Sequence, residues 1–181
     1  VAGVNTALWV TVNADPERSA RRYEDALRLS NLSSRARAFG WETIGRYYTD
    51  IKQLGRASLS YAYAMEIDPN HPRYPSSRGV VLMQVGDYEE AVANFRHSIA
   101  LDDGRFEARL NLGLALLQLE DTEGAVDAIR RAWELRPDIA RIPFALGVAY
   151  YAGKDYEQAI VAYESAIRLQ PDHVTAHLNL G

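Results

Sequence analysis

Five glycines stand at intervals of 34 residues along the chain, and this period constrains the fold more than any other feature of the sequence. They are Gly45, Gly79, Gly113, Gly147 and Gly181. The tetrapeptide LNLG ends at two of them, at residues 110–113 and 178–181. A fixed period of this length is typical of repeat architectures, in which each unit folds as one small supersecondary element.

Three further columns follow the same period. A small residue recurs at Ala57, Ala91, Ala125 and Ala159, and a large one at Tyr61, Phe95, Ile129 and Tyr163. A second small residue recurs at Ala64, Ser98, Ala132 and Ala166. Because a missing side chain lets two backbones approach, we expect the glycines to face the first small column. We expect the large side chains to fill the space beside the second small column.

Each unit has the pattern of two short amphipathic helices. In residues 140–173, apolar residues recur at helical spacing in two runs, which Gly153, Lys154 and Asp155 separate. Pro171 ends the second run because proline has no N–H for a further helical turn. One helical hairpin cannot bury both of its faces, so the units must stack. The sequence therefore predicts an all-α protein.

Composition excludes several function classes. The net charge of the 181 residues is −4, and no run of lysine or arginine supplies the basic surface of a nucleic-acid-binding protein. The apolar opening stretch, residues 1–12, is shorter than the roughly 20 residues that span a bilayer. The absence of cysteine suits the cytoplasm and the periplasm equally, so the compartment stays open. We interpret the chain as a soluble segment of a longer, bacterial protein.

The repeated residues resemble the tetratricopeptide repeat, whose signature reads W-x2-L-G-x2-Y, then A-x3-F, then P. The unit that matches best carries it at Trp41, Ile44, Gly45, Tyr48, Ala57, Tyr61, Ala64 and Pro69. The next unit departs most, with Arg78 before its glycine and Asp103 in place of the proline. The resemblance implies a right-handed superhelical solenoid of antiparallel helix pairs.

The period also sets the expected boundaries. We expect repeats at 38–71, 72–105, 106–139 and 140–173, and the first helix of a further repeat at 174–181. Upstream, Asp15 and Pro16 suit the start of a helix, and Ser19, Tyr23 and Ala26 have the spacing of a second helix. We interpret 1–33 as a divergent first unit, with its first helix at about 1–13, and 34–37 as an insertion.

In proteins of this family the first helices line a concave groove that binds an extended peptide or a helix. The resemblance places the wall at fixed distances from each glycine, and the wall becomes more apolar toward the later units. The candidate binding residues are Arg46, Met83, Leu110, Asn111, Leu114, Leu117, Gln118, Phe144, Val148 and Tyr151. Some of these side chains could instead pack against neighbouring first helices, and the sequence leaves both interpretations open.

The pattern indicates a noncatalytic scaffold that binds a peptide or helix of a partner protein. The clamp with which chaperone-binding members hold a terminal carboxylate is not indicated, because only Asn111 and Arg141 fit its positions. The alternative is a soluble appendage of a bacterial glycan-assembly or glycosyltransferase protein whose catalytic part lies outside this segment.

Two local motifs resemble a phosphate-binding loop and a zinc site, but neither matches the full pattern of such a site. Residues 147–155 resemble a phosphate-binding loop but hold one residue too many and lie along a predicted helix. His173 and His177 have a spacing that suits zinc, yet no third ligand is near in sequence. We therefore predict no catalytic residue, no cofactor and no metal.

The last eight residues, 174–181, correspond to the first helix of a hairpin. Without its second helix, we expect apolar surface around Ala159, Tyr163 and Ala166 to remain open. This predicts concentration-dependent self-association through the C-terminal end.

Overall fold

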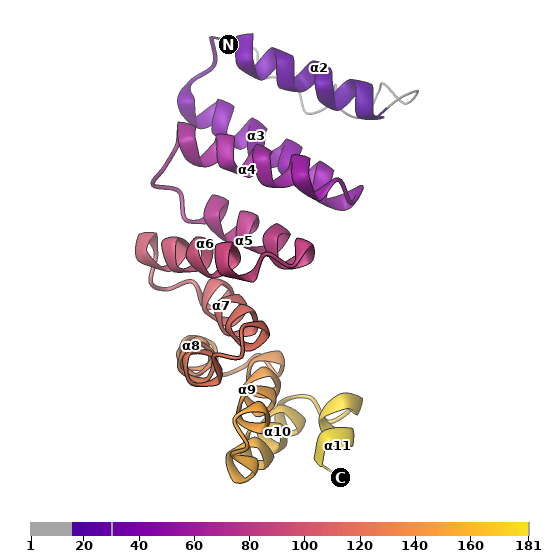
Figure 1. Ribbon diagram of the computed structural model, residues 1–181, viewed down its shortest axis with the longest axis vertical. Coiled ribbons are helices and arrows are strands. Elements are labelled where there is room, and N and C mark those ends of the chain that lie inside the picture. Colours follow the sequence, from indigo (N-terminus) through magenta and orange to yellow (C-terminus); the bar gives the residue numbers. More distant parts are fainter. Residues whose placement is uncertain (1–15, 30, 181) are drawn as a thin grey trace. The chain divides into compact units, whose positions relative to one another are not determined.

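The computed structural model describes residues 16–29 and 31–180, which form ten α-helices and no strand. The prediction of an all-α protein is confirmed. The helices are α2 (Pro16–Leu29), α3 (Ser34–Asp50), α4 (Leu54–Ile67), α5 (Arg73–Val85), α6 (Tyr88–Leu101), α7 (Phe106–Gln118), α8 (Thr122–Leu135), α9 (Arg141–Ala152), α10 (Tyr156–Leu169) and α11 (Val174–Leu180). Figure 1 shows them in chain order. The first helix expected at about 1–13 lies outside the described residues.

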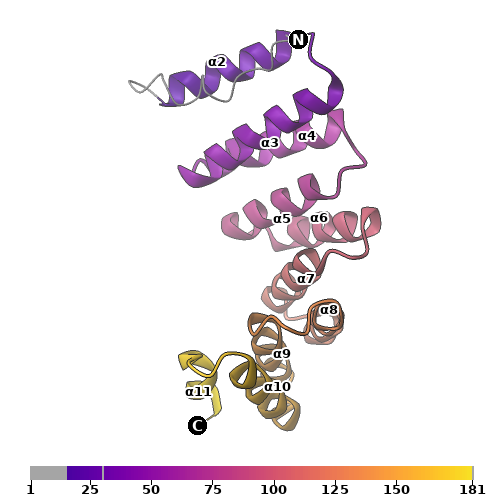
Figure 2. The same ribbon diagram turned by 180° about the vertical axis from the view of Figure 1, so that it is seen from behind.

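The chain divides into two compact units, Val1–Pro69 and Asn70–Gly181. In the first unit α3 packs against α4, and in the second α5, α7 and α9 pack against α6, α8 and α10 respectively. These pairs are the hairpins that the period predicts, and Figure 2 shows them from behind. We call α3, α5, α7, α9 and α11 the first helices, and α2, α4, α6, α8 and α10 the second helices.

In the second unit, successive hairpins stack through two kinds of contact. The second helix of one pair packs against the first helix of the next, as in the contacts of α6 with α7 and α8 with α9. First helices also meet one another, because α7 contacts both α5 and α9. A continuous buried cluster results, which holds Phe95, Leu116, Ile129 and Leu146 from four different helices.

Helix α3 is longer than the other first helices. It has 17 residues, compared with 13 in α5 and α7, and it begins at Ser34. Residues 34–37, which we interpreted as an insertion between units, therefore form the first turn of α3. Ser33 caps this turn, because its hydroxyl accepts a hydrogen bond from the Ala36 N–H at 3.3 Å.

The inward face of α2 differs from the expected one. The helix begins at Pro16. Ala26, however, is exposed, whereas Ala20 and Leu27 are buried and Tyr23 is half-buried. The spacing of Ser19, Tyr23 and Ala26, which we interpreted as that of a second helix, therefore lies one residue away from the face that is buried.

The glycine column faces the large column rather than the first small one. A Cβ atom added to Gly45, Gly79 or Gly147 would lie 2.9, 2.8 or 2.5 Å from the ring of Tyr61, Phe95 or Tyr163. At Gly113 it would meet Ile129 and lie 3.0 Å from the carbonyl oxygen of Ala125. The expected pairing with alanine side chains is therefore wrong at the atomic level. The glycine opens the space that the ring of its partner helix fills.

We expect Gly113→Ala to destabilise the fold by about 1–3 kcal/mol, because the new methyl group overpacks against Ile129 and a backbone oxygen. Gly55 is the matched control, since nothing lies within 4 Å of a Cβ atom added there. Gly55→Ala should stabilise the helix by up to about 1 kcal/mol. Urea unfolding of both variants measures the difference, and a stabilised Gly113→Ala would contradict the contact.

Each turn between paired helices has the same backbone design, also at intervals of 34 residues. Lys52, Gly86, Glu120 and Lys154 have positive φ angles of 62°, 89°, 61° and 63°. The next N–H in each turn donates to the carbonyl five residues back, as from Asp87 to Leu82 and from Asp155 to Tyr150. This is the hydrogen bond of a Schellman motif, which satisfies a carbonyl at a helix end.

An aspartate then starts the following helix in three of these turns. The side chains of Asp87, Asp121 and Asp155 accept hydrogen bonds from the backbone N–H three residues on, at 3.2, 2.9 and 3.2 Å. Such N-caps satisfy a free donor of the first helical turn. Tight C-terminal closure followed at once by an N-cap fixes the length of each hairpin turn.

Because left-handed backbone strains every residue except glycine, we expect opposite effects at equivalent positions. Gly86→Ala should destabilise the fold by about 1 kcal/mol, whereas Glu120→Gly should stabilise it by up to about 1 kcal/mol. Differential scanning calorimetry of the two variants gives the signs. Shifts of both melting temperatures in the same direction would show that side-chain contacts decide these positions.

The departures of the 72–105 unit from the family pattern each have a partner in the structure. Arg78 pairs with Glu90 of the next helix at 2.6 Å. The buried Ser98 hydroxyl donates to the Pro72 carbonyl at 2.7 Å. Asp103, in the place of proline, pairs with Arg109. Polar contacts thus replace the apolar ones expected in this repeat.

Candidate functional site

The ten candidate binding residues lie on first helices of both units. Arg46 is exposed on α3 in the first unit. The other nine lie in the second unit on α5, α7 and α9, which are neighbours through α7. The nine candidates of the second unit therefore lie on three successive first helices, whereas Arg46 lies in the first unit.

Exposure on these helices depends on position relative to the repeated glycine. Residues before the glycine are mostly buried: Ser76 is 7% exposed, and Leu110 and Ala145 are each 4% exposed. Leu110 belongs to the same buried cluster as Leu82 and Leu146. Its prediction as a groove residue is wrong, because it packs between neighbouring helices instead of facing solvent.

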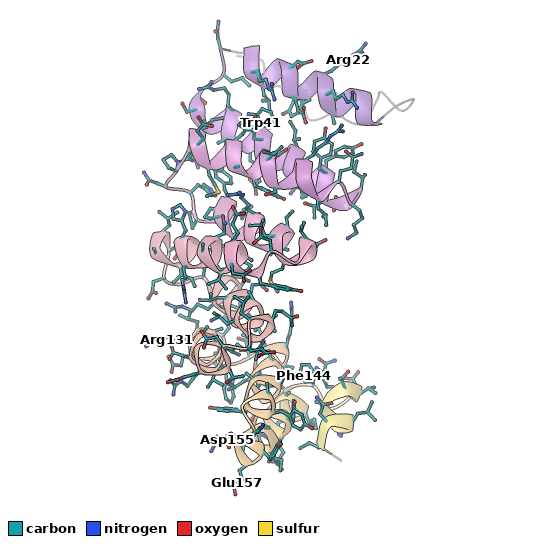
Figure 3. The ribbon with its side chains drawn as sticks, viewed as in Figure 1. Arg22, Trp41, Arg131, Phe144, Asp155 and Glu157 are labelled. Atoms are coloured by element: carbon teal, nitrogen blue, oxygen red, sulfur yellow. The ribbon has the colours of Figure 1, made fainter. Side chains whose placement is uncertain are left out.

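Phe144 is also engaged in packing. Its ring centroid lies 5.8 Å from that of Tyr163 on α10 and 4.7 Å from that of His173, just before α11. Figure 3 shows its position on α9. Asn111, the remaining candidate before a glycine, is half-buried. These contacts leave little of the N-terminal half of each first helix for a ligand.

The residues after the glycine are the accessible ones. Those one, four and five positions after it are half-buried or exposed in all three helices. We call this set the first-helix surface; it consists of Val80, Met83, Gln84, Leu114, Leu117, Gln118, Val148, Tyr151 and Ala152. No charged residue occurs in 79–85, 113–118 or 147–152. The surface is therefore apolar with amide side chains and carries no formal charge of its own.

Tyr151 is the most prominent side chain of this surface, with 60% of its area exposed. Its ring meets that of Tyr156 at the start of α10 edge to face, with 5.4 Å between centroids. Such aromatic pairs restrain each other's rotamers and still present apolar area. Exposed and held in this way, Tyr151 has the properties of an interface anchor.

We expect Leu110→Ala to lower the free energy of unfolding by about 2–5 kcal/mol, as for other buried leucines. Tyr151→Ser should lower it by about 1 kcal/mol or less, because it removes only an exposed aromatic contact. Urea titration of the two variants separates packing from surface residues. A large loss for Tyr151→Ser would assign it to the core.

The two histidines with zinc-like spacing serve the turn before α11. The Nδ1 atom of His173 accepts a hydrogen bond from the Ala176 N–H at 3.2 Å. The Nε2 atom of His177 lies 2.9 Å from the Pro171 carbonyl oxygen. In the described part of the chain, no group of three His, Cys, Asp or Glu side chains is arranged to hold a metal ion.

Residues 147–155, which resemble a phosphate loop, are divided between a helix and a turn. Gly147 lies inside α9, and Asp155 is the N-cap of α10 (Figure 3). Both residues thus have structural roles. Over residues 16–29 and 31–180, no helix is both long and apolar enough to cross a membrane.

The three residues of α10 that we expected to remain open near the C-terminal end are covered. Ala159, Tyr163 and Ala166 are all buried, so the prediction that they remain open is wrong. Burial raises the pKa of the Tyr163 hydroxyl, and a hydrogen bond with Asn179 of α11 opposes this shift. The exposed large apolar side chains on α10 are instead Tyr156, Ile160, Val161 and Leu169. Self-association stays a prediction that nothing in the structure tests.

Comparison with known families identifies the repeats. The family described as tetratricopeptide repeat matches residues 77–138, and the family described as TPR repeat matches residues 149–181. The chain is a tetratricopeptide repeat protein. This confirms the family that the glycine period and the alanine and aromatic columns indicate. Such repeats stack into solenoids whose extended surfaces serve protein–protein interaction.

Several solved structures share this repeat fold. The crystal structure of MamA is 26% identical, with a TM-score of 0.73 over 76% of this chain and 80% of that chain. YrrB, titled a TPR protein with an unusual peptide-binding site, is 23% identical, with a TM-score of 0.76 over 90% of this chain and 81% of that chain. MamA from Desulfovibrio magneticus RS-1, residues 41 to the end, is 24% identical, with a TM-score of 0.74 over 79% and 81%. No protein of curated function matches the sequence.

Proposed function

We propose that this repeat protein is a noncatalytic scaffold that binds an apolar peptide segment or helix of a partner on its first-helix surface. The observation that carries the proposal is the accessible, uncharged surface formed by the residues after each glycine of α5, α7 and α9. Contiguous apolar surface of this kind marks interaction sites in soluble proteins.

The chemistry of the surface favours a particular ligand. Met83, Leu117 and Tyr151 occupy the same position in three successive repeats, so they present apolar side chains at each repeat step. Gln118 is exposed beside Leu117, and its amide group can both donate and accept hydrogen bonds. A peptide with apolar side chains and free backbone groups matches this combination.

Related structures support the general role. YrrB shares the fold, and it is described as a TPR protein with an unusual peptide-binding site. None of the similar structures named above supports the glycan-assembly alternative. Arg46 lies in the other unit and has no part in the proposed surface.

A peptide-display selection against the full chain tests the proposal. We expect the selected peptides to be rich in leucine, isoleucine and aromatic residues. Val80→Ser and Tyr151→Ser, on the first and last helices of the surface, should each weaken binding about tenfold, as loss of an interface anchor does. Fluorescence anisotropy of labelled peptides measures the dissociation constants.

The matched control is Ile160→Ser, which removes a side chain that is 48% exposed on the second helix α10. It should leave the affinity unchanged. Because the surface has no charged residues, the affinity should change less than about twofold between 50 and 500 mM salt. Undiminished binding by Val80→Ser and Tyr151→Ser, or a strong salt dependence, would place the peptide site elsewhere.

A further inference from the structure

A cavity of about 480 Å³ lies in the first unit, among α2, the first two turns of α3 and the C-terminal end of α4. Its walls include Leu27, Arg28, Arg37, Trp41, Tyr63 and Glu66. The volume is in the range of cavities that bind small ligands or a few side chains. Two second helices and one first helix form it, so it is separate from the first-helix surface, and the inference does not depend on that surface.

Two aromatic rings form one side of the cavity. Trp41 is only 4% exposed, and its ring centroid lies 4.7 Å from that of Tyr63, at an interplanar angle of 41°. The guanidinium carbon of Arg28 lies 5.7 Å from both ring centroids. Arginine is held over aromatic faces by cation–π attraction. The rings therefore position the guanidinium group of Arg28, an exposed residue that lines the cavity.

A second arginine in the cavity has a donor without an acceptor. The Nε atom of Arg37 is buried from solvent and makes no hydrogen bond. Within the described ranges, neither Arg28 nor Arg37 forms an ion pair with a carboxylate. Because protein atoms enclose Nε, the terminal Nη groups of Arg37 are the donors left to reach a ligand in the cavity.

The charges in the wall select a monoanion. Two guanidinium groups and the carboxylate of Glu66 give the cavity a net charge of about +1, although the whole chain carries −4. Guanidinium groups bind carboxylates through paired N–H donors. Leu27, Trp41 and Tyr63 offer apolar surface beside these donors.

We propose that this cavity binds the carboxylate of a glutamate or aspartate side chain of a partner polypeptide, together with a neighbouring aromatic or aliphatic side chain. Arg37 and Arg28 hold the carboxylate, and the Trp41 and Tyr63 rings pack against the apolar neighbour. Glu66 disfavours ligands with two negative charges. The protein thus has an acidic-peptide site in its first unit.

The test uses two tripeptides that differ in one group, acetyl-Phe-Glu-Leu-amide and acetyl-Phe-Gln-Leu-amide, added to the full ¹⁵N-labelled chain. The glutamate peptide should shift the Arg37 Nε–H and Trp41 indole N–H resonances and saturate. Its dissociation constant should be about tenfold lower than that of the glutamine peptide, and it should rise with salt concentration. The indole resonance of Trp133, in the other unit, should not move.

Variants of the two arginines assign the contact. Arg37→Gln and Arg28→Gln should each raise the dissociation constant of the glutamate peptide to that of the glutamine peptide, and leave the latter unchanged. Arg22→Gln is the control, because Arg22 is exposed on the same helix α2 and does not line the cavity (Figure 3). Arg28→Gln removes an exposed side chain, so it provides the test even if Arg37→Gln perturbs folding.

Each of the following results would overturn the proposal: equal affinity for the two peptides, equal loss of affinity in Arg22→Gln, or tighter binding of inorganic phosphate at the Arg37 resonance. Peptide shifts confined to residues of α5, α7 and α9 would also remove this site while leaving the proposed function in place. Weakened binding through Tyr151→Ser together with intact binding at Arg37 would show that the two surfaces act independently.

Discussion

The fold depends on one contact made in every hairpin, in which a large side chain of the second helix lies against a glycine of the first. In each hairpin this large residue occupies the space that a side chain at the glycine position would take. The residues are Tyr61, Phe95, Ile129 and Tyr163. The contact sets how closely two helices approach, and the closeness lets small residues such as Ala57 and Ala125 be fully buried. Without it, neither the hairpin nor the stack of hairpins would close.

This packing also decides which residues face a ligand. Residues such as Leu110, three positions before the glycine, are drawn into the stack, whereas those one, four and five positions after it, such as Tyr151, stay accessible. The two ends of one helix therefore have different roles. The first-helix surface consists of the residues that stacking leaves accessible. It is uncharged because these residues have apolar or amide side chains.

The sequence predicts the hairpins well because period and helical spacing are properties of the chain itself. It predicts individual exposure poorly. Leu110 and Leu117 are the same residue type on one helix, yet the first is buried and the second half-exposed, because neighbouring helices decide the difference. The left-handed turn position cannot be recognised from residue type, because lysine or glutamate occupies it in three repeats and glycine in one. The face of α2 shows a third limit: its spacing matches the family pattern, but the buried residues lie one position away.

The cavity of the first unit could not be predicted, because its walls come from three helices and only their packing brings the side chains together. Arg37 stands in a turn that the other repeats lack, and this origin has a consequence. In a periodic array, the residues of one column occupy equivalent packing sites in every repeat. These columns therefore accept only a few kinds of residue. Four added residues lengthen α3 by about one turn, roughly 6 Å, without altering the columns that follow. An interruption of the period is thus a place where one repeat can acquire an individual property while its neighbours keep their shared architecture.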